Sequence, residues 1–398
     1  MKKLLFLTIP AIIFAKSFMI STIPLPKAYI QNLDPYGCNE NCMRDYLEHD
    51  MIFSFLAHAN KQLQDKTLDS ARALNFAILN IGAFNASGKI KIALLLPYKK
   101  IGRYAASTVN ATFAYLMTRS NPFILKSYRV EDEDVDTLTN TLEQIKADGF
   151  EYLIAPLTKT GAINLIAANP NINVYIPTIN KDNVETNSPY LFFGGIDYKA
   201  QSDLLLKEAT SPLVIFSGMS PTGKKLALYQ EDSYTNPDKV IQYFISRKTT
   251  NLQNYLKKNR RIAYGTFIVN TPVIKTGMIL SQLTLYDTKP RHILSTQINY
   301  NPLLLSMTQY GDRKNMIIAN SIIQNNDLLI DTNSLLGNDI VYNWINYTTT
   351  VGMDYFYSAI TGDTREFNIN LQNNQMVYDI TLVKPGISKF TPYKSYKK

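Results

Sequence analysis

The chain has 398 residues, of which 45% are hydrophobic and 18% charged, a balance that is typical of globular proteins and excludes an intrinsically disordered chain. The formal net charge is +9, but the basic residues are scattered, and the densest basic run, at 255–261, is offset by an acidic run at 131–136. A nucleic-acid-binding protein would carry a basic stripe with interleaved stacking groups, so we expect no nucleic-acid partner.

The first 15 residues have the pattern of a secretory signal peptide. Lys2 and Lys3 supply the positive start, residues 4–14 form the apolar stretch, and Ala15 offers a small residue at a cleavage point. The apolar stretch is too short to cross a bilayer as a mature helix, and no later segment reaches that length. No Cys follows it directly, so we expect no lipid anchor. The pattern predicts a periplasmic protein whose mature chain starts near Lys16.

The two cysteines, Cys38 and Cys42, lie close together in the sequence. In an oxidising compartment this spacing favours a local disulfide, whose loop is so short that it should stabilise the fold by only about 2 kcal/mol. The alternative is a metal site, for which His49 and His58 are the nearby candidate ligands. We expect the disulfide and no metal site.

Two amphipathic helices are predicted ahead of the main domain, over 43–66 and 68–84. Apolar residues recur in them at helical spacing, and these are Leu47, Met51, Phe55 and Ala59 in the first and Ala71, Leu74, Ile78 and Ile81 in the second. This pattern indicates a short helical hairpin that ends before Gly88.

From residue 89 the pattern changes to alternating strands and helices, which is typical of an α/β domain with right-handed crossovers. The run at 91–97 is apolar on both faces, as expected for a buried parallel strand. Strands are predicted at 91–97, 123–130, 151–156 and 173–177, and in a second set at 212–218, 263–270, 291–296 and 315–321. Helices are predicted at 105–119, 135–148, 161–168, 199–209, 237–247, 273–286, 302–310 and 338–360. A hairpin with Asn373 and Asn374 at its turn is predicted over 367–383. This number of strand–helix units indicates that the domain has two lobes.

One segment partly matches a phosphate-binding P-loop. Gly218, Gly223 and Lys224 occupy three of its positions, but Lys225 stands where a Ser or Thr should bind magnesium. The segment that follows, 226–237, is also too short and irregular to form the long helix whose N-terminus should hold the phosphate. The sequence therefore favours a loop at the mouth of a cleft.

Other enzyme motifs are incomplete. Two Lys-Thr-Gly triplets, at 159–161 and 275–277, lack the Ser-x-x-Lys at a helix start that serine acyl enzymes need. The acidic run at 131–136 lacks the Gly and the terminal Glu of a calcium loop, and it stands before a helix, where carboxylates are favourable. We expect a protein that is not an enzyme, with no catalytic residue, metal or cofactor.

The order of these segments resembles the type I periplasmic binding protein fold. The resemblance covers about residues 89–390 and rests on "ALLLPYKKIGRYAASTVNATFAYL", "YLIAPLTKTGAINLIA" and "VYIPTIN". The segments "LSTQINYNPLLLSMTQYGDRKNMIIANS" and "FNINLQNNQMVYDITLVKPGISKF" are most similar to the C-terminal domain of lipoprotein activators of penicillin-binding proteins, the LpoA-like group. The resemblance implies a two-lobed α/β fold with Rossmann-like parallel sheets, preceded here by the short helical hairpin.

By position, the resemblance also implies a set of ligand-binding residues. Thr158, Thr160 and Gly161 would form the ligand loop of the first lobe, Thr178 and Asn180 the next strand tip, and Tyr234 the loop of the second lobe. The sequence departs from the pattern of amino-acid receptors because Lys159 stands among the small hydroxyl residues.

Two functions follow from this resemblance. The first is a non-enzymatic scaffold that engages a protein complex of the cell envelope, like a penicillin-binding-protein activator or a flagellar-motor component, with the hairpin as its docking arm. The second is a solute-binding protein that closes two lobes on a small polar ligand such as an amino acid or a peptide. The expected organisation is a signal peptide at 1–15, an N-terminal extension at 16–87, the bilobed domain at 88–390 and a basic tail at 391–398.

Overall fold

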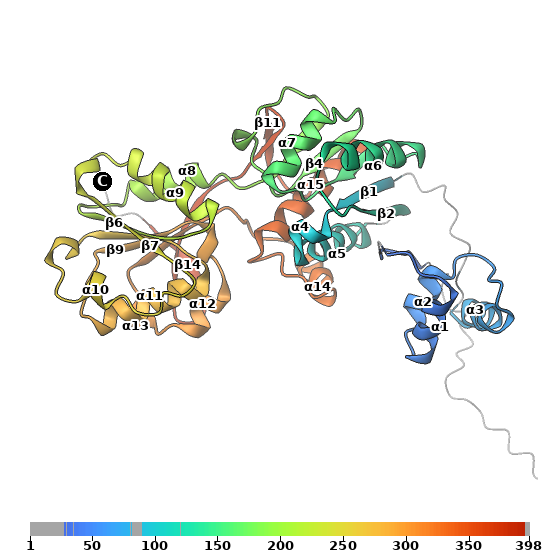
Figure 1. The fold of residues 1–398 in the computed structure, drawn as a ribbon, viewed down its shortest axis with the longest axis horizontal. Helices are drawn as coiled ribbons and strands as arrows, with labels where there is room; N and C mark the ends of the chain where they lie inside the picture. The colour runs from blue at the N-terminus through green and yellow to red at the C-terminus, as the bar shows by residue number, and fades with distance from the viewer. Residues whose placement is uncertain are drawn as a thin grey trace, which may run out of the picture. The chain divides into compact units, whose positions relative to one another are not determined.

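A computed structural model describes residues 28, 30–34, 36–79, 81, 90–119 and 121–394 (Figure 1). The predicted signal peptide, the predicted domain border near Gly88 and the last residues of the predicted basic tail lie outside the described residues. By their contacts the described residues form two compact units, one built from three short helices and one that contains residues 90–394. Within the described residues no helix is long and apolar enough to cross a membrane.

The small unit contains three helices where the sequence predicted two. They are α1 (Glu40–Glu48), α2 (Ile52–His58) and α3 (Lys66–Ile78). The expected helix over 43–66 is broken because Asp50 adopts a left-handed conformation, with φ of 57°. A small core holds the three helices together, and it consists of Met43, Phe55, Leu56, Ala59 and Leu68.

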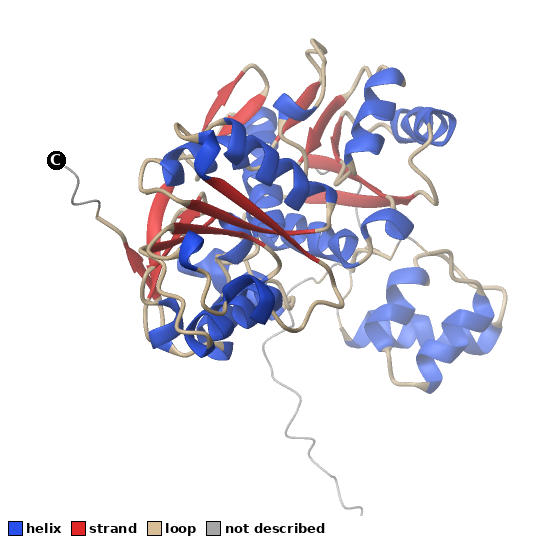
Figure 2. Ribbon diagram, turned by 60° about the vertical axis from the view of Figure 1, so that its left-hand side comes forward, coloured by secondary structure: helices blue, strands red, loops and turns tan. Residues whose placement is uncertain are grey.

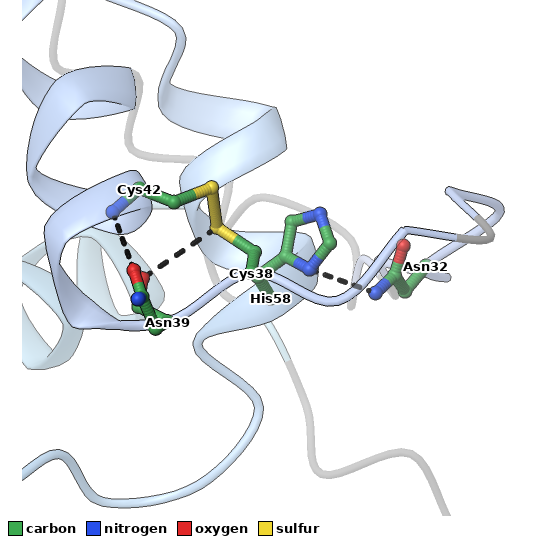
Figure 3. Close-up of a disulfide and its surroundings, with 5 residues drawn as sticks. All are labelled: Asn32, Cys38, Asn39, Cys42 and His58. Carbon is green, nitrogen blue, oxygen red and sulfur yellow. Dashed lines mark hydrogen bonds between the residues drawn. A yellow bond between two sulfur atoms is a disulfide. The ribbon is translucent and has the colours of Figure 1, made fainter.

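The two cysteines lie at the start of α1 (Figure 3). The Cys38 and Cys42 sulfur atoms are joined at 2.08 Å, and the Asn39 side chain caps the helix by accepting the Cys42 N–H at 3.0 Å. The Nδ1 atom of His58 lies 3.1 Å from the Asn32 amide nitrogen, whereas His49 contacts the Asp45 carbonyl at 2.9 Å. Within the described residues no group of three or more His, Cys, Asp or Glu side chains is placed to hold a metal.

The first lobe of the large unit is a seven-stranded sheet in the order β11-β12-β5-β4-β3-β1-β2. Its strands are β1 (Ile90–Leu96), β2 (Phe123–Arg129), β3 (Tyr152–Ile154), β4 (Asn173–Ile176), β5 (Leu191–Phe193), β11 (Asn370–Gln372) and β12 (Gln375–Val377). Its helices are α4 (Tyr98–Ile101), α5 (Arg103–Met117), α6 (Val135–Ala147), α7 (Lys159–Ala167), α14 (Asp327–Leu335) and α15 (Trp344–Thr361).

Strand β1 contributes side chains to the apolar cores on both faces of this sheet. Ile92 and Leu94 belong to the core formed with α5 and α15, whereas Ala93 and Leu95 belong to the core formed with α6 and α7. All four side chains are fully buried, as the continuous apolar pattern of the strand predicted.

The second lobe repeats this plan with a seven-stranded sheet in the order β14-β13-β10-β9-β8-β6-β7, and helices again lie on both faces (Figure 2). Its strands are β6 (Leu213–Gly218), β7 (Val240–Ile245), β8 (Thr266–Asn270), β9 (His292–Ser295), β10 (Met316–Asn320), β13 (Thr381–Pro385) and β14 (Phe390–Pro392). Its helices are α8 (Tyr198–Leu206), α9 (Pro221–Asp232), α10 (Gln253–Leu256), α11 (Val273–Leu285), α12 (Pro302–Met307) and α13 (Tyr310–Arg313). Short 3₁₀ turns are η1 (Lys181–Asn183), η2 (Pro237–Lys239), η3 (Arg260–Ile262) and η4 (Gln297–Asn299).

The chain passes between the lobes in three crossing segments, which follow β5, β10 and β12. The first lobe therefore combines 90–193 with 327–377, and the second combines 198–320 with 381–392. The predicted two-lobed α/β fold is confirmed.

A predicted helix and the predicted hairpin of the large unit differ from the structure. The prediction of a helix near 237–247 is wrong, because 240–245 form the edge strand β7. This strand pairs in parallel with β6 along six residues. The predicted hairpin over 367–383 ends earlier, since β11 and β12 turn at Asn373 and Asn374, both with positive φ, while β13 pairs antiparallel with β10 in the other lobe.

Helix α15 carries a buried carboxylate that joins three parts of the first lobe. Asp354 is 1% exposed, and its oxygens accept hydrogen bonds from the Tyr115 hydroxyl at 2.8 Å and from Arg365 Nε at 3.2 Å. They also accept the backbone N–H groups of Glu366 at 2.8 Å and Phe367 at 3.2 Å. Burial, followed by the charge of Asp354, raises the pKa of Tyr115, so its hydroxyl stays a donor.

Candidate functional site

A cavity of about 360 Å³ lies between the two lobes. The first lobe lines it with the start of α7, the loop after β4 and the start of α15, and the second lobe lines it with the start of α8 and with α9. The segment that joins β5 to α8 forms a further part of its wall. Cavities of this size, placed beyond the carboxyl ends of parallel strands, are where α/β proteins commonly bind small ligands.

Three lysines from three helices line this cavity. Lys159 opens α7, Lys199 is the second residue of α8, and Lys225 lies in the second turn of α9. Burial lowers the pKa of Lys225, and the positive charges of Lys159 and Lys199 lower it further. Among the residues that the structure describes, no carboxylate forms an ion pair with any of these ammonium groups.

Other contacts fix the positions of two of these lysines. The Lys225 ammonium donates to the Asn183 amide oxygen, and this bond links the second lobe to the first. The Lys199 ammonium lies 5.6 Å from the centre of the Tyr229 ring, which also lines the cavity. Asp182 and Asp197 complete the charged lining. Asp197 caps α8, because its Oδ1 accepts the N–H groups of Lys199 and Ala200, both at 2.9 Å.

The predicted ligand loop of the first lobe is filled by a side chain of the protein itself. Glu133 is 3% exposed, and its Oε1 accepts the Thr158 N–H at 2.9 Å while its Oε2 accepts the Thr158 hydroxyl. The Thr158 hydroxyl oxygen in turn accepts the Gly161 N–H at 3.1 Å. A Cβ atom at Gly161 would lie 2.4 Å from the Glu133 carboxyl carbon, so this carboxylate fits closely against the glycine. Thr160 lies in the first turn of α7 but does not line the cavity.

Thr178 and Asn180 do line the cavity, but their polar atoms have partners within the protein. The Thr178 hydroxyl donates to the Leu157 carbonyl at 2.5 Å. The Asn180 amide donates to the Gly195 carbonyl at 3.2 Å and accepts the Asp182 N–H at 3.0 Å.

The structure does not bring Tyr234 to the cavity. Its hydroxyl lies 3.0 Å from the Ser211 hydroxyl, and its ring is buried in the core of the second lobe. Ser211 precedes β6, so Tyr234 lies at the amino end of that strand, whereas the cavity lies beyond the carboxyl ends. The loop around Tyr234, which was expected to contact a ligand, instead follows the end of α9 and packs against the sheet of the second lobe.

No protein-family model and no curated protein matches the sequence. Solved structures do match. The branched-chain amino acid transporter substrate binding protein LivJ from Streptococcus pneumoniae, in complex with isoleucine, matches over 76% of this chain and 97% of that chain, with 12% identity and a TM-score of 0.56. LpoA from Haemophilus influenzae matches over 90% of this chain and 72% of that chain, with 11% identity and a TM-score of 0.51.

The C-domain of Haemophilus influenzae LpoA, a regulator of PBP1A, matches over 76% of this chain and 100% of that chain, with 10% identity and a TM-score of 0.50. The chain has a type I periplasmic binding protein-like fold. The predicted resemblance is confirmed at the level of the fold, which the similar structures use for binding or for regulation.

Within this binding-protein fold, the strand tips of the second lobe are closed by buried side chains. Asn270, at the end of β8, donates to Ser217 at 3.2 Å and to Gln230 at 2.7 Å. Gln230 donates in turn to Ser202 at 3.0 Å. Since all four side chains are buried and bonded to one another, they are not free to bind a ligand.

A second buried network holds the crossing segments of the fold. Gln201 donates to the Ser321 hydroxyl at 2.7 Å and accepts the Gln297 N–H at 2.8 Å, while Gln297 accepts the Ser321 N–H at 2.6 Å. The segment after β5 is bonded to the segment after β12, because the Tyr378 hydroxyl donates to the Gly194 carbonyl at 2.7 Å. The segments after β5 and β12 are thus bonded to each other, and the segment after β10 is bonded to α8 and η4 of the second lobe.

The lysine cluster is not among the site residues predicted from the sequence. Lys159 and Lys225 depart there from known motifs, and Lys199 and Tyr229 match no motif. A usable signal was present, because each lysine lies within two turns of the start of a helix that follows a strand. The loop predicted at 218–225 is helical from Pro221 onward, because α9 (Pro221–Asp232) begins there, and the segment after Lys225 stays helical only to Asp232.

Proposed function

We propose that the protein is a non-enzymatic binding protein of the periplasm that uses its bilobed fold to engage a protein complex of the cell envelope. A penicillin-binding-protein activator and a flagellar-motor scaffold are the two roles of this kind. The observation that carries the proposal is that Glu133 occupies the ligand loop at the start of α7.

A ligand carboxylate that used this loop would have to displace Glu133. Leaving this buried carboxylate without its hydrogen bonds would cost on the order of 1–3 kcal/mol or more. The buried amide networks of the second lobe present the same obstacle to polar ligands. The fold is therefore better suited to presenting a fixed outer surface than to closing on an amino acid.

The helical unit supports the proposed docking role. Leu74 and Ile78, one turn apart on α3, are 60% and 57% exposed, and Phe53 on α2 is 66% exposed. Exposed apolar side chains one turn apart on a helix can lie in a hydrophobic groove of a partner protein. We call the surface formed by Leu74 and Ile78 the apolar face of α3, and we assign it to the contact with the protein partner.

The partner should be lost when the apolar face of α3 is made polar. We expect a tagged full-length chain to co-purify from the envelope with a penicillin-binding protein or a flagellar-motor protein, identified by mass spectrometry. The double substitution Leu74→Ser and Ile78→Ser should reduce its recovery at least tenfold. Leu335→Ser is the matched control, since Leu335 is an 87% exposed leucine on α14. Equal recovery with all three chains would contradict the assignment.

Solute binding is a second candidate function, favoured by the cavity between the lobes. Thermal unfolding against a panel of free amino acids and short peptides separates the two functions. A ligand at a hundred times its dissociation constant would add about 2.7 kcal/mol to the free energy of unfolding. From the occupied loop we expect no such gain with amino acids. A gain that Asn180→Ala abolishes would favour the amino-acid receptor over the scaffold, because Asn180 lines the cavity.

A further inference from the structure

We propose that the cavity between the lobes binds a small organic anion with two or more negative charges, held by the ammonium groups of Lys159, Lys199 and Lys225. This inference rests on the second candidate function, that the cavity is a ligand site. It differs from amino-acid binding because it uses the lysines and leaves Glu133 in the α7 loop.

The first reason is the uncompensated positive charge of the cavity. Three ammonium groups line it together with two carboxylates, those of Asp182 and Asp197. The Asp197 oxygen that caps α8 is already bonded to two backbone N–H groups. The three lysines have no carboxylate partner within the described residues, so each retains N–H groups for an anion.

The second reason is that the three charges act on one another. Burial lowers the pKa of Lys225, and the charges of Lys159 and Lys199 lower it further, which means that these three positive charges repel one another across the cavity. An anion placed among them would remove this repulsion and gain charge-assisted hydrogen bonds. Since the lysines come from both lobes, one anion would bridge the lobes alongside the bond between Lys225 and Asn183.

The remaining lining indicates an organic body rather than a bare inorganic ion. The Trp344 and Tyr229 rings line the same cavity, together with the apolar side chains of Ile179, Ile196 and Leu226. A volume of about 360 Å³ is far larger than a phosphate or sulfate ion needs and is within the range of small-molecule sites. The ligand class is therefore a di- or tricarboxylate or a phosphorylated small molecule.

Calorimetric titration of the full-length chain with citrate and with glucose 6-phosphate tests the proposal and separates the two anion chemistries. Inorganic phosphate and isoleucine serve as comparison ligands. We expect at least one organic anion to bind, more tightly than inorganic phosphate, and isoleucine not to bind. Raising the salt concentration should weaken this binding, because exposed charges contribute to it.

Lysine variants show whether the cavity is responsible. Lys225→Gln should weaken anion binding about tenfold or more, and the triple substitution of Lys159, Lys199 and Lys225 by Gln should abolish it. Lys224→Gln is the matched control, because Lys224 neighbours Lys225 on α9 but does not line the cavity. Failure of both organic anions to bind, or equal weakening by Lys224→Gln and Lys225→Gln, would overturn the proposal. The co-purification experiment with the triple variant keeps the functions apart, since the partner of the α3 face should still be recovered.

Discussion

Replacement of Asp354 by Ala should lower the free energy of unfolding by about 3–5 kcal/mol, because it removes a buried carboxylate that pairs with the partly exposed Arg365 and accepts three further hydrogen bonds. The substitution leaves Arg365, the Tyr115 hydroxyl and two backbone N–H groups without their acceptor. Each buried donor that loses its partner adds to the cost. Helix α15 would then lose these hydrogen bonds to α5 and to the segment that leads into β11, while its apolar packing remains.

Urea unfolding followed by circular dichroism measures this effect. Asp331→Ala is the matched control, since Asp331 is an exposed carboxylate on α14 of the same lobe, and we expect it to change stability by less than about 0.5 kcal/mol. Asp354→Asn should recover only part of the loss, because its amide would place a donor against the Arg365 and Phe367 donors. A loss below about 1 kcal/mol for Asp354→Ala would contradict the role given to this network.

Gly352→Ala should destabilise the protein by about 1–3 kcal/mol or more, although Ala favours a helix over Gly by about 1 kcal/mol. Gly352 lies within α15, and a Cβ atom there would lie 2.0 Å from Cε1 of the Tyr175 ring. The ring cannot move away easily. It is fully buried, its hydroxyl donates to the Thr348 carbonyl at 2.9 Å, and it also lies closely against Gly194.

Thermal and urea unfolding of Gly352→Ala and Gly311→Ala shows whether the helix preference of Ala or its clash with Tyr175 determines the change in stability. Gly311→Ala on α13 is the matched control, because no atom lies within 4 Å of the position of its Cβ, and its stability should be unchanged or higher. Adding Tyr175→Ala to Gly352→Ala should show strong coupling, since the second substitution removes the clash. A Gly352→Ala protein as stable as the parent would show that the ring relocates at little cost.

The sequence predicted the architecture because the periodic signals are strong there. The buried strand β1 and the Asn-Asn hairpin turn between β11 and β12 have local patterns that only one structure satisfies. Strand β7 was mistaken for a helix, since its half-buried residues at the sheet edge lack a clear period of two. Its identity is set by pairing with β6, which no local pattern reports.

The candidate site was harder to predict, because its parts meet only in three dimensions. The resemblance placed Thr178 and Asn180 at the cavity but could not show that their polar atoms are already bonded. The contact of Glu133 with Thr158 joins residues 25 positions apart, and the lysines of the cavity come from three separate helices. Single lysines at helix starts are ordinary surface residues until the fold brings them to one cavity.

The order of strands in the two sheets has a consequence for how the chain acquires its structure. Each sheet is completed by a strand pair from the last 29 residues, β11 with β12 in one and β13 with β14 in the other. Helix α15, which packs in the core of the first lobe, follows residues 198–320 of the second lobe in the chain. Synthesis from the amino terminus therefore delivers most of the second lobe before the first lobe can be completed. Until the last strands have been synthesised, the edges of β5 and β10 are unpaired and can form incorrect strand pairs. We therefore expect the two lobes to complete their folding late and together.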